Sequence, residues 1–217
     1  MLFFQSLLSL ALAQLAVAQY GAPDPSQSSS AAGPAPSAPA DTAGHHNIDV
    51  FPNGTYVFHP ANITANVGDL VTFYFPNSGA ISHSVTQSSF ANPCTHLAAN
   101  GSDPAGFDSS LLTSTTFTLN ITSTNPIWFH CKQVLHCGMG MVGSINAPLT
   151  GNNTHANYVA NAMAIGNNEV TETDTGTPVL TGVNAVPVGP PGSSDAMRVA
   201  AKGGLYFAVV AVLMSLI

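Results

Sequence analysis

The stretch Cys131-Lys-Gln-Val-Leu-His136-Cys-Gly-Met-Gly-Met141 places a thiol, an imidazole and a thioether within one short segment. It follows the apolar run 127–130, which has the composition of a β-strand. A thiolate with imidazoles and a weak thioether is the ligand set of a mononuclear copper electron-transfer site. Such a site needs a second imidazole from elsewhere in the chain. His83, in Ile81-Ser-His83-Ser-Val85-Thr, is the best-placed candidate.

The sequence around this stretch predicts an all-β domain. Runs rich in Val, Ile, Phe, Tyr and Thr alternate with Gly, Pro and Asn turns between residues 47 and 147, a spacing typical of a sandwich or barrel. Val71, Phe73 and Phe75 alternate with Thr72 and Tyr74, as in a half-buried strand. About 100 residues suffice for one such core. The expected strands are Thr55–His59, Asp69–Phe75, Ser82–Gln87, Ser114–Ile121, Ile127–Cys131 and Met141–Asn146.

The N-terminal residues have the features of a secretory signal. Residues 1–18 form an apolar run ending in Ala16-Val17-Ala18, which is an A-x-A cleavage pattern. We therefore expect the mature chain to begin at Gln19. Residues 19–44 are rich in Pro, Ala and Ser, the composition of a disordered or O-glycosylated spacer.

The C-terminal residues have the layout of a GPI-attachment signal. Residues 205–217 are apolar, which is short for a bilayer span of roughly 20 residues. Small residues precede them at Gly192, Ser193 and Ser194. We favour Ser193 as the attachment residue, and a retained anchor or an incidental apolar tail are the alternatives. The expected organisation is a signal peptide (1–18), spacer (19–44), β-domain (45–150), possible short helix (151–165), stalk (166–193) and GPI-attachment propeptide (194–217).

The charged residues of the chain are few and mostly acidic, which excludes one class of function. Only 6% of the 217 residues are charged and the formal net charge is −7. The Lys and Arg residues are Lys132, Arg198 and Lys202 alone, and this excludes nucleic-acid binding, which needs a basic surface. If both ends are removed, Lys132 is the one basic side chain left, next to the candidate thiolate.

Five Asn-x-Ser/Thr sequons agree with a secreted, glycosylated surface protein. Sequons arise easily in a chain rich in Asn and Thr, so each alone is a weak indication. The predicted glycosylation sites are Asn53, Asn62, Asn100, Asn120 and Asn152.

The stretch around the candidate ligands resembles the cupredoxins, and in particular the plant phytocyanins and the fungal extracellular proteins similar to them. The resemblance covers residues 47–147 and is carried by His83-Ser-Val85, then Cys94, and then the loop from Cys131 to Met141. It implies a Greek-key β-sandwich that binds one copper ion through His83, Cys131, His136 and Met141.

Other residues compete for these roles. Met139 is an alternative axial ligand, although its spacing to His136 is shorter than the family pattern. Zinc is an alternative metal for the Cys and His residues, but a thioether is a poor zinc ligand. The adjacent His45 and His46 are candidates for Cu(II) on a flexible segment, although such pairs are more often solvated. No partner pattern is seen for His59, His96 and His155, which we expect on strands or at the surface.

The resemblance also implies a disulfide. In phytocyanins the Cys that follows the loop His pairs with the earlier Cys, which corresponds here to Cys137 and Cys94. An oxidising compartment permits this bond, and Cys131 then remains as the odd thiol of the three, held as a metal ligand.

The segment Trp128-Phe129-His130-Cys131 also resembles the last motif of multicopper oxidases. Those enzymes place His on both sides of the Cys to bind a trinuclear cluster, but Lys132 occupies the second position here. The chain also has no His-x-His pair. Oxygen reduction is therefore not expected, and His130 should point away from the metal because side chains alternate along a strand.

A site closed by four protein ligands has no open position for a substrate, which favours electron transfer over catalysis. We therefore expect a monomeric, non-enzymatic one-electron carrier on the outer cell surface or wall, held by a GPI lipid, with an unidentified redox partner. Val134, Leu135 and Met139 near His136 either form an apolar docking patch or pack inside. A copper store or carrier, and a wall module that merely keeps the fold, remain alternatives.

Overall fold

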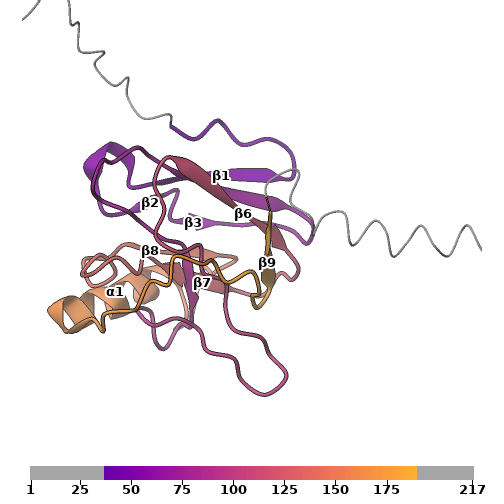
Figure 1. The fold of residues 1–217 in the computed structure, drawn as a ribbon. Coiled ribbons are helices and arrows are strands. Elements are labelled where there is room, and N and C mark those ends of the chain that lie inside the picture. Colours follow the sequence, from indigo (N-terminus) through magenta and orange to yellow (C-terminus); the bar gives the residue numbers. More distant parts are fainter. Residues whose placement is uncertain (1–36, 190–217) are drawn as a thin grey trace, which may run out of the picture. The chain divides into compact units, whose positions relative to one another are not determined.

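The computed structural model describes residues 37–189, which form two β-sheets with one α-helix at the side (Figure 1). One sheet has the strand order β2-β1-β4-β6-β9 and the other β3-β8-β7-β5. The strands are β1 (His45–Val50), β2 (Phe58–His59), β3 (Asn62–Ile63), β4 (Leu70–Phe75), β5 (Thr86–Ser88), β6 (Thr115–Ile121), β7 (Ile127–His130), β8 (Val142–Ile145) and β9 (Ala185–Val188). The helices are the 3-10 turns η1 (Pro52–Gly54) and η2 (Gly166–Asn168) and the α-helix α1 (His155–Ile165). The predicted β-sandwich is confirmed.

The first sheet is built around β4, which pairs in parallel with β1 and antiparallel with β6. Val71, Phe73 and Phe75 face the core, as their alternation predicts. Thr72 on the other face is buried as well. Its hydroxyl lies 2.8 Å from His45 Nε2 and 2.9 Å from Thr118 Oγ1, so a polar contact across three strands explains this burial.

The second sheet places β7 between β5 and β8. All four residues of β7 are buried because both faces of this strand are covered. Phe129 enters the core between the sheets, where its ring lies 5.0 Å from Phe58 and 5.3 Å from Phe73, edge to face. Trp128 points the other way and packs on Tyr158 of α1.

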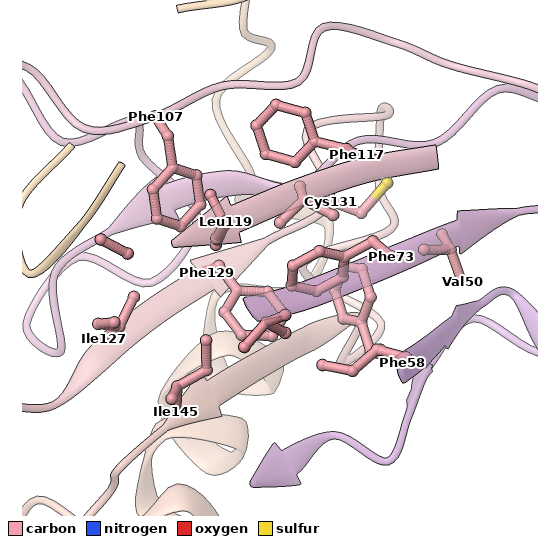
Figure 2. Close-up of a cluster of buried hydrophobic side chains, with 14 of the residues drawn as sticks. Val50, Phe58, Phe73, Phe107, Phe117, Leu119, Ile127, Phe129, Cys131 and Ile145 are labelled. Carbon is pink, nitrogen blue, oxygen red and sulfur yellow. The ribbon is translucent and has the colours of Figure 1, made fainter. Parts of the chain in front are cut away.

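The core between the two sheets is largely aliphatic and aromatic, and Cys131 is part of it (Figure 2). Fully buried side chains such as Phe73 and Leu119 each stabilise the fold by about 1.5–3 kcal/mol. The site described below therefore rests on a well-packed part of the molecule, immediately after β7.

The expected short helix is present as α1. Thr154 caps its N-terminus by accepting a hydrogen bond from Asn157 N at 3.3 Å. Tyr158 and Ala162 are buried, whereas Met163 is 58% exposed. Within residues 37–189, no helix has both the length and the apolar character needed to cross a membrane.

The expected stalk differs from what the structure contains. The described part of that segment, residues 166–189, runs along the sandwich, and β9 pairs with β6. Ala185 and Pro187 are buried, and Gln87 holds Val183 through both its side-chain oxygen and its amide. The Thr- and Gly-rich composition gave no sign of these contacts, because each joins an isolated residue or a backbone group to a distant part of the chain.

Two N-terminal expectations also change. His45 and His46 lie on β1, an ordered strand, and not on a flexible segment. Part of the expected spacer also binds the domain, because Asp41 accepts a hydrogen bond from Asn47 N and Asp49 accepts one from Ala38 N. The signal peptide, the rest of the spacer, Ser193 and the propeptide lie outside the described residues.

Candidate metal centre

The loop after β7 is closed on itself by backbone hydrogen bonds. Cys131 N donates to Met141 O at 3.1 Å, and Met141 N donates to His136 O at 2.9 Å. Leu135 and Gly140 have positive φ angles of 69° and 98°, which let the chain turn sharply on either side of His136. The loop therefore brings its thiol, imidazole and thioether residues to one end of the sandwich.

His83 comes to the same place from a distant segment. It lies just before β5, where it exchanges backbone hydrogen bonds of 3.1 and 2.7 Å with Leu112. Its side chain is fully buried, and its Nδ1 lies 3.9 Å from Cys131 Sγ. The structure thus brings together His83 and Cys131, which are 48 positions apart.

Three donor atoms converge at this point. His136 Nδ1 lies 3.5 Å from Cys131 Sγ, and the donor atoms of His83, Cys131 and His136 all lie within 4.8 Å of one another. An ion bound at roughly 2.0–2.3 Å by each nitrogen and sulfur requires donors that are about 3–4 Å apart. The set therefore fits a single metal ion.

Burial keeps both imidazoles neutral. It lowers the pKa of His83 to about 4, and the neighbouring His136 contributes to this shift. Burial also lowers the pKa of His136 to about 4. At neutral pH each ring has a nitrogen lone pair free for a metal, which is the form that binds.

The thiol of Cys131 keeps its proton until a metal ion replaces that proton. Burial raises the pKa of Cys131 to about 12, partly offset by the backbone amide of Ser84, whose nitrogen lies 3.4 Å from Sγ. A coordinating metal deprotonates such a thiol outright. Ser84 is itself fixed, because its Oγ accepts a hydrogen bond from Lys132 N at 2.8 Å.

Met141 and Met139 differ in burial. Met141 is fully buried, while Met139 is 48% exposed. Of the two, Met141 is the one buried as fully as the other candidate ligands. Its backbone is hydrogen-bonded to both Cys131 and His136.

The disulfide implied by the family resemblance is present. Cys94 and Cys137 are bonded to each other, which leaves Cys131 as the free cysteine. Since Cys137 follows His136 directly, the bond ties the ligand loop to the segment that follows His83.

The other histidines lie apart from the cluster. His130 is buried, and its Nε2 lies 3.4 Å from Glu172 Oε2, on a carboxylate and not on the donor cluster. His46 lies between Asp41 and Asp69, at 3.3 Å from each. His96 Nε2 is 2.8 Å from Gly106 O, and His155 Nδ1 is 2.9 Å from Ser144 Oγ.

Sequence reasoning missed a set of acidic contacts that support the loop from outside. Glu169 accepts a hydrogen bond from Gly138 N at 2.6 Å. Lys132 Nζ lies 2.6 Å from Asp108 and 2.7 Å from Asp174, so the lone cation beside Cys131 is neutralised by two carboxylates. No local motif identifies these acidic residues. The one indication in the sequence was Lys132 itself, since a Lys in such an acidic chain should have a carboxylate partner.

Five predicted sequons lie in the described part of the chain. Their use in glycosylation stays a prediction. The side chains of Asn53, Asn62, Asn100 and Asn152 are exposed, whereas Asn120, in β6, is half-buried.

The fold and the cluster together define a β-sandwich protein with a candidate single-ion centre. Comparison with known proteins points to one family of this class. The chain is 34% identical to the "Probable GPI-anchored cupredoxin-1" of Arthroderma benhamiae over 150 residues, which cover 64% of this chain and 76% of that protein. It is 31% identical to an "Extracellular serine-rich protein" of the same organism over 58% of this chain and 48% of that one.

A solved structure of auracyanin from Roseiflexus castenholzii matches 48% of this chain and 97% of its own, with 16% identity and a TM-score of 0.37. No family model matches the chain. From the first of these relationships, the chain belongs to the cupredoxin family, whose fold is that of blue-copper electron-transfer proteins.

Proposed function

We propose that this protein is an extracellular mononuclear blue-copper protein that carries single electrons at the cell surface. The observation that carries the proposal is the convergence of Cys131 Sγ with the Nδ1 atoms of His83 and His136 at 3.9 and 3.5 Å. A thiolate with two imidazoles and a thioether is the donor set of such sites.

His83, Cys131 and His136 would hold the metal, with Met141 as a fourth and weaker ligand. When bound, copper supplies a reversible one-electron couple between Cu(II) and Cu(I). The residues around it keep the donors fixed: Ser84 N–H points to the sulfur, and the loop is closed by its own backbone bonds. Little rearrangement between the two states is the property that a carrier needs.

All proposed ligands are protein side chains, and each is at most 5% exposed. Catalytic metal sites keep a position open for water or substrate. The proposed role is accordingly transfer of electrons between partners and not turnover of a substrate. Val134, Leu135 and Met139 of the ligand loop are 39–49% exposed, and such exposed apolar side chains are what a contact surface for an unidentified redox partner requires.

The proposed location is the outer face of the plasma membrane or the cell wall. An A-x-A pattern at residues 16–18 and a disulfide support secretion. A relative named as GPI-anchored supports lipid attachment near Ser193. In this arrangement the domain of residues 37–189 would act as a monomer tethered to the membrane.

A visible spectrum of the chain, expressed in a secreting host with copper, tests the proposal. We expect an intense thiolate-to-copper band and one reversible redox wave. Cys131→Ser should remove the band, whereas Thr124→Ala, at an exposed bend, should keep it. A colourless protein carrying zinc under copper-replete conditions would refute the proposal, and rapid loss of copper to a chelator would favour a copper store.

A further inference from the structure

Four aromatic rings form a closed group at the candidate metal centre. Phe51 stacks on His83, with ring centroids 4.3 Å apart and planes at 29°. Tyr56 lies 4.4 Å from His136. The two imidazoles are 5.0 Å apart, and Phe51 and Tyr56 are 5.2 Å apart. Each imidazole of the site therefore has its own aromatic partner, and the two partners contact each other.

The chain between β1 and β2 is shaped to bring these partners there. Phe51 N donates to Val57 O at 3.0 Å, and Thr55 N donates to Pro52 O at 3.0 Å, so residues 51–57 form a closed turn. Phe51 has φ 59° and ψ 47°. This left-handed conformation is costly for an aromatic residue, and such backbone strain is concentrated at functional sites.

Burial places the two aromatic residues on the solvent side of the imidazoles. Cys131 and His83 are fully buried and His136 is 5% exposed, whereas Phe51 and Tyr56 are half-buried. The turn 51–57 therefore forms part of the layer that separates the two imidazoles from solvent.

The stacking also supplies a constraint that is otherwise missing for His83. Metal-binding histidines are normally oriented by a hydrogen bond from the second ring nitrogen to a carboxylate or carbonyl. Among residues 37–189, His83 Nε2 is buried with no such partner. The ring plane is held instead by packing, and Phe51 is the ring that packs on it face to face.

We propose that Phe51 and Tyr56 are positioning residues that form an aromatic cover over the metal centre. The cover holds the two imidazoles with Nδ1 directed at Cys131 Sγ and slows exchange of the metal with solvent. This inference rests on the proposed function, since it assigns these residues a role toward the metal that His83, Cys131 and His136 would bind.

Two pairs of variants separate the role of the rings from that of the backbone. Tyr56→Ala removes one ring, and Tyr56→Phe keeps it. Phe51→Asn removes the other ring while keeping a residue that tolerates the left-handed conformation, and Phe51→Tyr keeps the ring. Phe90→Ala is the matched control, since Phe90 is also half-buried but packs on Trp128, 5.0 Å away, in the cluster beside α1.

Two measurements on the full secreted chain test the cover. The first is the rate at which the ascorbate-reduced protein loses copper to bathocuproine disulfonate. Loss of one aromatic contact should accelerate this step by about two- to tenfold. The second needs no metal: the rate at which dithiobisnitrobenzoate modifies the free thiol of Cys131 in the metal-free protein should rise by a similar factor.

Tyr56→Ala and Phe51→Asn should show both effects, and Tyr56→Phe, Phe51→Tyr and Phe90→Ala should show neither. The inference is overturned if the two ring-removing variants behave like the wild type, or if Phe90→Ala changes the rates as much as they do. Circular dichroism checks each fold, and Tyr56→Leu replaces Tyr56→Ala if the latter does not fold. A wild type without the visible copper band refutes the proposed function alone, because the thiol measurement still decides whether the cover exists.

Discussion

At the scale of single residues, the protonation of Cys131 determines the charge of the metal-free site and the pH dependence of metal binding. Burial raises the pKa of its thiol to about 12, so the metal-free site keeps a neutral thiol between two neutral imidazoles. No uncompensated charge is then buried, which keeps the metal-free fold stable. A metal replaces the thiol proton, so its binding releases that proton and weakens as the pH falls.

Asp174 gives a prediction that pH can test. Its Oδ1 accepts hydrogen bonds of 2.7 Å from Lys132 Nζ and from Ser110 Oγ. Burial acts to raise the pKa of this carboxyl, but these two donors outweigh it and hold the pKa below its ordinary value of 3.8. The folded state therefore binds a proton less readily than the unfolded chain, and the stability it gains is present above that ordinary value and lost as the pH falls through the lower folded one.

We expect Asp174→Asn to lower the free energy of unfolding at neutral pH by about 1–2 kcal/mol, the range for hydrogen bonds to a charged group beside partial solvent exposure. As the pH falls below the ordinary carboxyl pKa of 3.8, the difference from wild type should shrink, because the native carboxyl becomes protonated too. Urea unfolding between pH 2 and pH 7 measures both the loss of stability at neutral pH and its decrease at low pH. Asp103→Asn, at an exposed turn, serves as the control, and an equal loss at every pH would contradict the explanation.

The convergence of His83, Cys131 and His136 was predictable because two of them lie in one loop of defined spacing, and the family resemblance points to His83 as the third. The residues that support them were not. Gly138 shows why: a Cβ at this position would lie 2.1 Å from the carbonyl oxygen of Gly166. The need for glycine comes from a contact with a segment 28 positions away, as does the role of Glu169, and no local pattern encodes either.

At the scale of elements, α1, η2 and β9 make up a C-terminal layer, of which the sequence predicts only the helix. α1 covers the outer face of β7 and β8 through Tyr158 and Ala162. β9 completes the edge of the first sheet next to β6. Alternation of large apolar residues made β4 and β6 recognisable in the sequence, and a continuous apolar run did so for β7. In contrast, β1, β3 and β9 are short or polar and gain their stability from neighbouring strands.

Because this layer packs on both sheets, we expect that the domain cannot be shortened to residue 150 without loss of stability. A chain ending at residue 150 loses α1 and β9, and thereby exposes Trp128, Val142 and the free edge of β6. We expect it to unfold at a lower urea concentration than a chain ending at residue 189. Its free energy of unfolding should be lower by several kcal/mol, because Tyr158 and the residues packed around it are no longer buried.

The comparison uses two otherwise identical chains that begin at residue 37 and end at 150 or 189. Circular dichroism and urea titration report folding, and tryptophan fluorescence reports exposure of Trp128, the single Trp in the sequence. Equal stability of the two chains would mean that the C-terminal layer is an accessory of the sandwich and not part of it.

At the scale of the whole molecule, two cross-links join the same two regions of the chain. The disulfide connects Cys94 to Cys137, and the proposed metal connects His83 to Cys131 and His136. One region contains β5, with His83 before it and Cys94 after it, and the other follows β7. The disulfide restricts the loop between the two regions in the unfolded chain, whereas the proposed metal links them in the folded state, and both hold His136 close to the first region.

The disulfide gives the prediction at this scale. It closes a loop with a sequence separation of 43, which should stabilise the folded state by about 3–4 kcal/mol in the chain-entropy model. We expect the double variant Cys94→Ala with Cys137→Ala to lose about that much free energy of unfolding in the metal-free state. Removing both cysteines leaves Cys131 as the one thiol, so no new disulfide can form.

Copper should recover part of this loss, because binding to the folded state alone stabilises it by mass action and restores a link between the two regions. The measurement is urea unfolding of wild type and double variant, each with and without copper. Because this gain depends only on the affinity of the folded site, the wild type and the variant should gain equally from copper if the disulfide does not shape the site. A smaller gain in the variant, or none, would show that the disulfide is needed to keep His136 in place for the metal.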